Sequence, residues 1–259
     1  MRFPLSIALV ATFSLLPAAK LCCQTETNVT RAPDGDVQQG VDGLSVPGIA
    51  GAPFSLHAAL ETSHQLPDGT TVTHKSTMFI ARDSQGRIYR ERRRIVPADN
   101  PGEAQLIGKI VIDAVAKTRT DCILMQRICR ITALQTPPPA PVEPVGPSKT
   151  GAFYLTRENL GASTVDDVEV QGTREIRTWN PGAFGNDHPV AVTKESWYSP
   201  RLQINLTVTR YDPRTGTQKI TVSDLSLSDP DPSQFALPPG FRVIDERKPT
   251  TPMIPQPQP

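Results

Sequence analysis

Hydrophobic and polar residues alternate with a period of two along several stretches of the chain. In residues 54–60 and 204–208 every second position is apolar. Successive side chains of a β-strand point to opposite faces of a sheet, so both stretches predict strands with one apolar face. The pattern at 106–117 is the nearest to a helical period, but its β-branched isoleucines and valines favour a strand.

Turn sequences separate these predicted strands at short intervals. Asp68 and Gly69 form a dipeptide typical of a β-hairpin, and the segments 82–87 (RDSQGR) and 212–216 (DPRTG) also have turn character. Strands joined by such short turns predict a mainly β protein, built as a single antiparallel meander sheet with few short helices. One face of that sheet should pack on an apolar core.

Three segments lack the alternating pattern and bound the predicted domain. Residues 24–50 are polar and rich in glycine, which predicts a flexible leader. Proline is concentrated in residues 136–150 and 247–259, and proline has no N–H to donate within a central strand. We therefore expect one β domain over 51–246, interrupted by a Pro-rich loop at 136–150 and followed by a disordered Pro-rich tail. Two separate domains are the alternative, but each would have to bury a core with few aromatic residues.

Residues 1–23 have the order of a secretory signal peptide, with an apolar stretch at 3–16 followed by small residues. This stretch is shorter than the roughly 20 residues that a membrane span needs, so we expect no transmembrane span after cleavage. Cys22 and Cys23 leave a lipid anchor open as an alternative, although the residues before them match a lipoprotein signal poorly. The predicted location is periplasmic or extracellular, with membrane attachment if Cys22 or Cys23 is lipidated.

Cys122 and Cys129 lie in an apolar, β-branched stretch. A hairpin turn at 124–127 would place Ile123 opposite Ile128 and the two cysteines opposite each other, close enough for a disulfide. Export favours this disulfide, because the compartment is oxidising. Two reduced, buried thiols are the alternative, whereas redox motifs and zinc sites favour other spacings.

The chain offers little that would support catalysis, metal binding or nucleic-acid binding. The formal net charge is +1, and the basic segment 90–94 has too few neighbouring aromatics for a nucleic-acid reader, which favours a solvated sheet face. His57 and His74 could meet across a hairpin near Glu61, but surface histidines explain them more simply. Asp187-His188 (187–188) has no recognisable nucleophile beside it. We expect no enzyme activity, no cofactor and no metal site.

Several motifs resemble a group of uncharacterised exported bacterial β-proteins. They are the segments GNDHP (185–189), WYSP (197–200), DPRTG (212–216) and the ending DPSQFALPPGF (231–241), with 70–93 similar in character. The resemblance extends over about residues 50–244. More distantly, the layout is similar to the periplasmic lipoprotein-carrier superfamily (LolA/LolB-like), which implies a curved half-barrel whose concave face holds acyl chains. No motif matches the lipid-contacting residues of those carriers.

The resemblance and the alternating strands together predict a non-enzymatic, exported cell-envelope protein whose concave face binds a hydrophobic ligand. A lipid or lipoprotein would be its partner. The residues expected to line the face are Phe54, Leu56, Met78, Ile80, Trp197, Ile204, Leu206 and Val208. In the alternative, the same residues form a sealed core and the protein is a structural or interaction module.

Overall fold

The computed structural model describes residues 29–31, 37–39, 44–135 and 142–247. The predicted signal peptide, Cys22 and Cys23, most of the predicted leader, the prolines at 137–139 and the tail from residue 248 lie outside these ranges.

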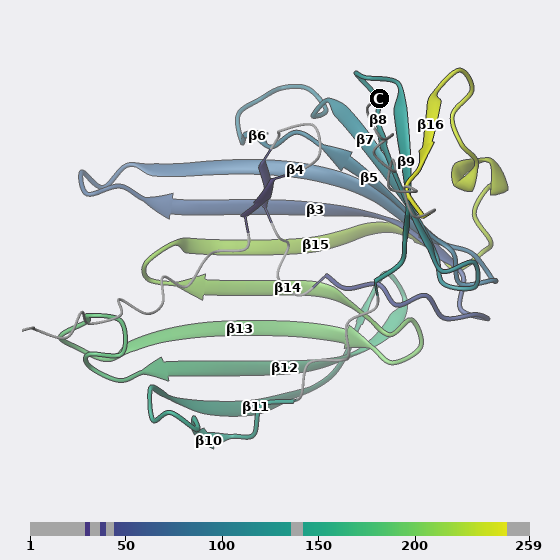
Figure 1. Ribbon diagram of the computed structural model, residues 1–259. Coiled ribbons are helices and arrows are strands. Elements are labelled where there is room, and N and C mark those ends of the chain that lie inside the picture. Colours follow the sequence, from purple (N-terminus) through teal and green to yellow (C-terminus); the bar gives the residue numbers. More distant parts are fainter. Residues whose placement is uncertain (1–28, 32–36, 40–43, 136–141, 248–259) are drawn as a thin grey trace, which may run out of the picture.

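One sheet of 14 strands makes up almost all of the described chain, so the predicted fold class is confirmed (Figure 1). The strands of this sheet are β3 (Phe54–Gln65), β4 (Thr71–Arg82), β5 (Ile88–Arg93), β6 (Val96–Pro97), β7 (Leu106–Asp113), β8 (Thr118–Ile123), β9 (Ile128–Ala133), β10 (Gly146–Pro147), β11 (Phe153–Val165), β12 (Val168–Trp179), β13 (Val190–Ser199), β14 (Ile204–Asp212), β15 (Gly216–Ser226) and β16 (Arg242–Asp245). The strands β1 (Val29–Arg31) and β2 (Val37–Gln39) pair separately.

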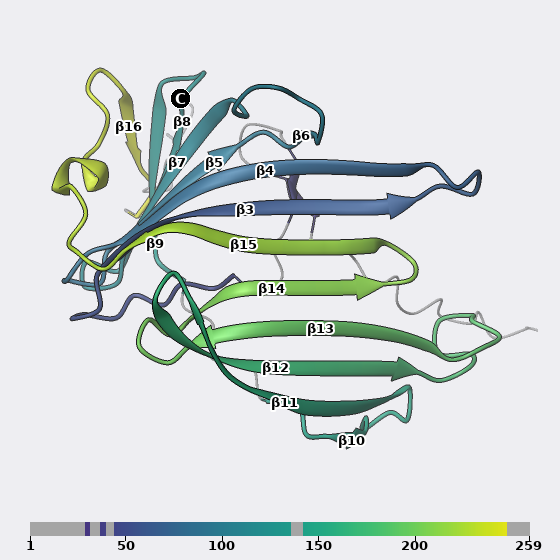
Figure 2. The ribbon, with the colours of Figure 1, turned by 180° about the vertical axis from the view of Figure 1, so that it is seen from behind.

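The two halves of the chain join in the middle of this sheet. The strand order is β10-β11-β12-β13-β14-β15-β3-β4-β5-β7-β8-β9-β16, with β6 attached to β4. The joining pair is β15 and β3, where Ile220 lies opposite Leu60. The sheet is open and curved: β3, β4 and β11–β15 run side by side, whereas β5 and β7–β9 bend away from them (Figures 1 and 2).

The end of the chain departs from the antiparallel meander. After β15, the short 3-10 helix η1 (Pro232–Phe235) leads to β16, which pairs in parallel with β9. The ring of Phe235 contacts Tyr89 of β5 at 6.5 Å between centroids, and the guanidinium of Arg87 lies over Phe235 at 4.8 Å. These contacts hold the crossover against the bent part of the sheet. The closing strand is parallel to its neighbour, whereas the sequence predicts an antiparallel meander.

The main apolar core gathers on one face of the sheet. Direct pairing sets this face: Leu56 lies opposite Ile80, and Ile220 lies opposite both Leu60 and Val208. Paired residues project from the same side, so the alternating apolar positions meet there. The buried cluster comprises Leu44, Phe54, Leu56, Ala58, Leu60, Ile80, Val168, Val170, Leu202, Ile204, Leu206, Val208, Ile220 and Val222. We call this set the apolar cluster.

The domain begins earlier than residue 51. Leu44 is only 7% exposed and belongs to the apolar cluster, and Val46 packs against it. The start of residues 44–50 therefore packs against the sheet, although these residues fall within the predicted leader. The apolar residues of this segment do not predict a strand, because glycine and proline interrupt the alternating pattern.

Candidate functional site

The apolar cluster contains most of the residues predicted to line a ligand site. Six of them are almost completely buried, with 0 to 1% of their surface exposed: Phe54, Leu56, Ile80, Ile204, Leu206 and Val208. Met78 and Trp197 are partly buried and pack against the cluster. The structure thus brings all eight residues together, with Met78 and Trp197 at the margin.

Trp197 is held at this margin by a close fit with Gly172. The two residues lie opposite each other on β13 and β12. A Cβ atom on Gly172 would stand 2.7 Å from Cζ3 of Trp197 and 2.9 Å from Cβ of Leu160, closer than van der Waals contact allows. The indole Nε1 donates a hydrogen bond to Oε1 of Glu195 at 3.1 Å. Glycine at position 172 therefore makes room for the indole ring beside the cluster.

Strand residues supply most of the cluster and its margin, and only four residues come from outside strands: Leu44, Val46, Leu202 and Leu227. The described residues contain one short helix and, besides the large sheet, only the three-residue strands β1 and β2. An apolar sheet face normally packs against a second layer of secondary structure. Here the part of the chain that the structure describes supplies only short non-strand segments for that layer.

A fully buried arginine joins these segments at the edge of the cluster. The side chain of Arg82 has an exposed fraction of 0%, and its guanidinium lies 4.8 Å from the centre of the Phe54 ring. Its Nε, Nη1 and Nη2 donate to the main-chain carbonyls of Ala52, Pro47 and Leu202 at 2.8, 3.0 and 2.9 Å. Burial lowers the pKa of Arg82. Three carbonyl dipoles thus stabilise the Arg82 charge, as a carboxylate would. The same hydrogen bonds hold Pro47 and Ala52 next to the β13–β14 turn.

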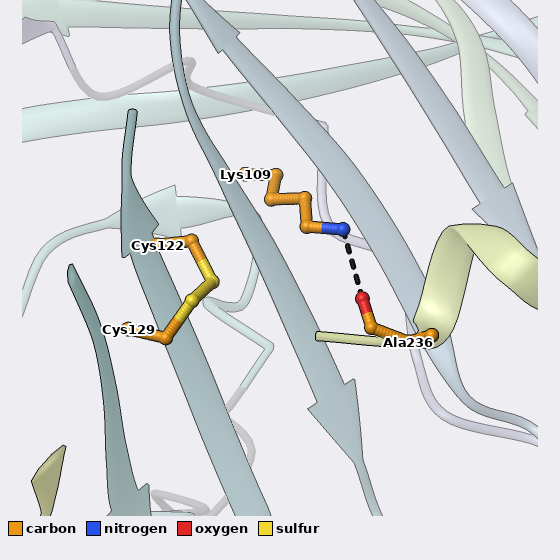
Figure 3. Close-up of a disulfide and its surroundings, with 4 residues drawn as sticks. All are labelled: Lys109, Cys122, Cys129 and Ala236. Atoms are coloured by element: carbon orange, nitrogen blue, oxygen red, sulfur yellow. Dashed lines mark hydrogen bonds between the residues drawn. A yellow bond between two sulfur atoms is a disulfide. The ribbon is translucent and has the colours of Figure 1, made fainter. Parts of the chain in front are cut away.

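The cysteine hairpin forms as predicted from its spacing. Cys122 lies opposite Cys129 and Ile123 opposite Ile128, with 124–127 as the turn. The two sulfur atoms are bonded, and the Cα atoms are 4.0 Å apart (Figure 3). The disulfide joins neighbouring strands near the edge of the sheet, at a distance from the apolar cluster in the strand order.

A hydrogen bond beside the disulfide joins the C-terminal crossover to the sheet. Nζ of Lys109, the residue paired with Cys122 on β7, donates to the carbonyl of Ala236 at 2.9 Å, just after η1 (Figure 3). Burial lowers the pKa of Lys109. Together with the Phe235 contacts, this hydrogen bond holds the C-terminal crossover on the sheet.

The residues considered for catalysis are not assembled into a site. Asp187 and His188 lie 3.6 Å apart, but their side chains are 90 and 87% exposed. His74 lies opposite Thr62, whereas His57 pairs with Phe79 and approaches Asp224 at 3.3 Å, so the two histidines do not meet across the hairpin. Among the described residues, no three His, Cys, Asp or Glu side chains are placed to hold a metal ion. In the same part of the chain, no helix is long and apolar enough to cross a membrane.

Sequence reasoning missed two arginines that the structure makes prominent. The segment 82–87 predicts a turn that includes Arg82, but Arg82 is the last residue of β4 and is buried. The basic segment 90–94 predicts a solvated face, yet the Nε atom of Arg90 is buried. Extending the alternation of Met78 and Ile80 by two residues would have placed Arg82 on the core face.

No protein-family profile matches the chain. No curated protein matches it either. Matching solved structures include an uncharacterised conserved protein from Thermus thermophilus, with 9% identity, coverage of 75% of this chain and 90% of that chain, and a TM-score of 0.37. The lipoprotein LppX from Mycobacterium tuberculosis matches with 9% identity, coverage of 66 and 85%, and a TM-score of 0.28. A LolA superfamily protein from Nitrosomonas europaea matches with 11% identity, coverage of 71 and 90%, and a TM-score of 0.25. The superfamily that the sequence resembles is thus among the matches, and the fold assignment itself rests on the strand order.

Proposed function

We propose that this protein is a non-enzymatic, exported protein of the cell envelope that binds a hydrophobic ligand, a lipid or the lipid part of a lipoprotein, on the apolar face of its curved sheet. One observation carries the proposal: seven strands contribute to the apolar cluster and its margin, but only four non-strand residues join them among the residues described. A ligand that displaced part of this thin cover would pack against the sheet in its place.

The margin of the cluster is where a ligand would enter. Met78 and Trp197 are partly exposed there, and Leu44 and Val46 come from a segment outside the sheet. Moving this segment aside would uncover apolar surface, and covering that surface with an acyl chain contributes about 0.8 kcal/mol for each CH₂ group buried. An enzymatic role has no comparable support, because the Asp187–His188 pair is exposed to solvent. Export is supported by the order of residues 1–23 and agrees with the disulfide.

A second candidate is an interaction module with a sealed core. It is favoured by the near-complete burial of six of the eight proposed lining residues. If the cluster is only a core, a small hydrophobe will find no space in it, since protein interiors are close-packed.

Native mass spectrometry of the mature protein, purified from its own envelope, tests the proposal. We expect extra mass that organic solvent removes. Titration with dodecan-1-ol should also shift the emission of Trp197 in a Trp179→Phe variant, in a saturable way. A bare chain with an unchanged spectrum would contradict the proposal and leave the interaction module.

A further inference from the structure

A row of paired residues leads directly from the apolar cluster to Arg90. Leu56 of β3 lies opposite Ile80 of β4, Ile80 lies opposite Arg90 of β5, and Arg90 lies opposite Ile110 of β7. Directly paired residues project from the same face, with Cβ atoms roughly 4.5–5.5 Å apart. Arg90 therefore stands next to a fully buried member of the apolar cluster.

Arg90 is partly buried and keeps one donor unused. Its Nε is buried and has no hydrogen-bond partner among the described residues. The next carboxylate along the row, Asp121, already accepts two hydrogen bonds from Arg119, from Nε at 2.7 Å and from Nη2 at 2.8 Å. Burial, and to a lesser degree the charge of Arg119, lower the pKa of Arg90. A buried guanidinium nitrogen without a partner is costly, and an oxyanion that reached it would reduce that cost.

The same face carries further arginines around Arg90. Arg92 lies opposite Gly108, and its Nη2 is 3.2 Å from the position that a Cβ of Gly108 would occupy, so the guanidinium lies close over the glycine. Arg130 lies opposite Asp121 and forms an ion pair with Glu246. Arg119 pairs with Ile112, in the next row of the same face. Several arginines therefore lie on the face that continues from the apolar cluster into the bent part of the sheet.

From this juxtaposition we infer that the ligand is an anionic amphiphile, whose acyl chain lies on the apolar cluster and whose head-group oxyanion binds Arg90. This inference rests on the proposed function and names the ligand class for the same site. A guanidinium presents paired N–H donors that match a carboxylate or phosphate. The apolar residues Ile80 and Ile110 on either side of Arg90 would contact the first carbons of the chain. A free inorganic anion would leave these contacts unused, which favours a lipid as the source of the oxyanion.

Binding of two probes with equal chains tests the inference. Dodecanoate carries the oxyanion and dodecan-1-ol does not, and both are used below the concentrations at which they aggregate, at neutral pH and low salt. We expect the wild-type protein to bind dodecanoate about tenfold or more tightly than dodecan-1-ol, as one charged hydrogen-bonded contact would give. Arg90→Met should remove this preference and leave the affinity for dodecan-1-ol unchanged.

Lys149→Met is the matched control, because it removes one positive charge from an exposed position near the opposite edge of the sheet. This variant should keep the wild-type preference. The wild-type comparison needs no variant, so it tests the inference even if Arg90→Met fails to fold.

Three results would overturn the inference. Equal affinities of the wild type for the two probes would refute the anionic head group while leaving the hydrophobic ligand in place. Binding of neither probe would refute the inference and the proposed function together. Inorganic phosphate that binds as tightly as dodecanoate, and loses affinity in Arg90→Met, would show a free-anion site instead of a lipid site.

Discussion

The guanidinium of Arg82 donates a hydrogen bond from Nη2 to the main-chain carbonyl of Leu202 at 2.9 Å, across 120 residues of sequence. The other hydrogen bonds of Arg82 go to Pro47 and Ala52. The end of β4, the segment before β3 and the β13–β14 turn therefore meet at one charged group. Because Leu44 and Val46 lie just before Pro47, this group also sets the position of the segment that covers part of the apolar cluster.

Arg82→Met should destabilise the protein by about 3 kcal/mol, because it leaves one buried and two partly buried carbonyls without their donors. Lysine should not rescue the loss, since a single ammonium group cannot reproduce the planar fork of donors. Urea unfolding followed by circular dichroism measures the effect. Arg201→Gln, at an exposed residue beside Leu202, is the control and should leave the midpoint unchanged. Wild-type stability in Arg82→Met would show that the carbonyls find other donors.

Removing the disulfide should lower stability without disturbing the hairpin. The bond between Cys122 and Cys129 closes a short loop, for which chain entropy predicts a loss of about 2–3 kcal/mol in the double variant Cys122→Ser, Cys129→Ser. The midpoint of urea unfolding should fall for the oxidised wild type when a reductant is added, and the reductant should have no effect on the double variant. An identical midpoint in the wild type with and without reductant, once thiol titration confirms reduction, would contradict this account.

Asp212 should make stability depend on pH in the acid range. Its side chain is 1% exposed and forms ion pairs with Arg214 at 2.7 Å and Arg210 at 3.1 Å. Burial alone would raise the pKa of Asp212, but hydrogen bonds from Arg214 and the charges of Arg214 and Arg210 outweigh it, so the pKa is lowered. The ionised group therefore stabilises the folded state above the unfolded-state pKa of about 3.9, and this contribution is lost as pH falls through the lower folded-state value.

Asp212→Asn should accordingly cost about 1–3 kcal/mol at pH 7, and the difference from the wild type should shrink below about pH 4. Urea midpoints measured from pH 7 to pH 2.5 give this difference directly. Asp187→Asn, at a residue 90% exposed, provides the control and should follow the wild-type curve throughout. A difference that stays constant with pH would mean that the carboxylate charge is not the cause.

Gly172→Ala should displace the Trp197 ring. The added methyl group would overlap Cζ3 and Cη2 of the indole, so we expect a loss of about 1–3 kcal/mol and a change in the emission of Trp197. The Trp179→Phe background isolates this emission. Gly102→Ala has open space around its Cβ, where the nearest atom is 3.8 Å away, and should be neutral. An unaltered spectrum for Gly172→Ala would show that the indole is not held as described.

Local patterns predicted the parts of the fold that depend on neighbours in sequence. The alternation at 54–60 and 204–208 marked core strands, and the spacing of Cys122 and Cys129 set the register of their hairpin, because a short turn fixes which residues face each other. The parallel pairing of β16 with β9 could not be predicted in this way, since it depends on a crossover held by Phe235 and Lys109.

In the candidate site, too, the features set by local sequence were predicted and those set by distant contacts were not. The eight predicted lining residues do gather in one place, because all except Trp197 stand at alternating apolar positions. Their role as a ligand surface remains a prediction, since a core and a binding face have the same local pattern. The environments of Arg82 and Arg90 depend on segments distant in the sequence, so local patterns did not predict them. Such segments supply carbonyl acceptors to Arg82, whereas the buried Nε of Arg90 has no hydrogen-bond partner among the described residues.

The connection from β9 to β10 limits how flat the sheet can become. In the strand order, 11 steps separate these consecutive strands, and at about 4.8 Å per step a flat sheet would hold them roughly 53 Å apart. The chain from Ala133 to Gly146 has 13 residue steps (146 − 133 = 13), which reach at most about 43–47 Å even when fully extended. The Pro-rich connection is thus shorter than the width of the flat sheet, and it acts as a tether that only a curved sheet can accommodate.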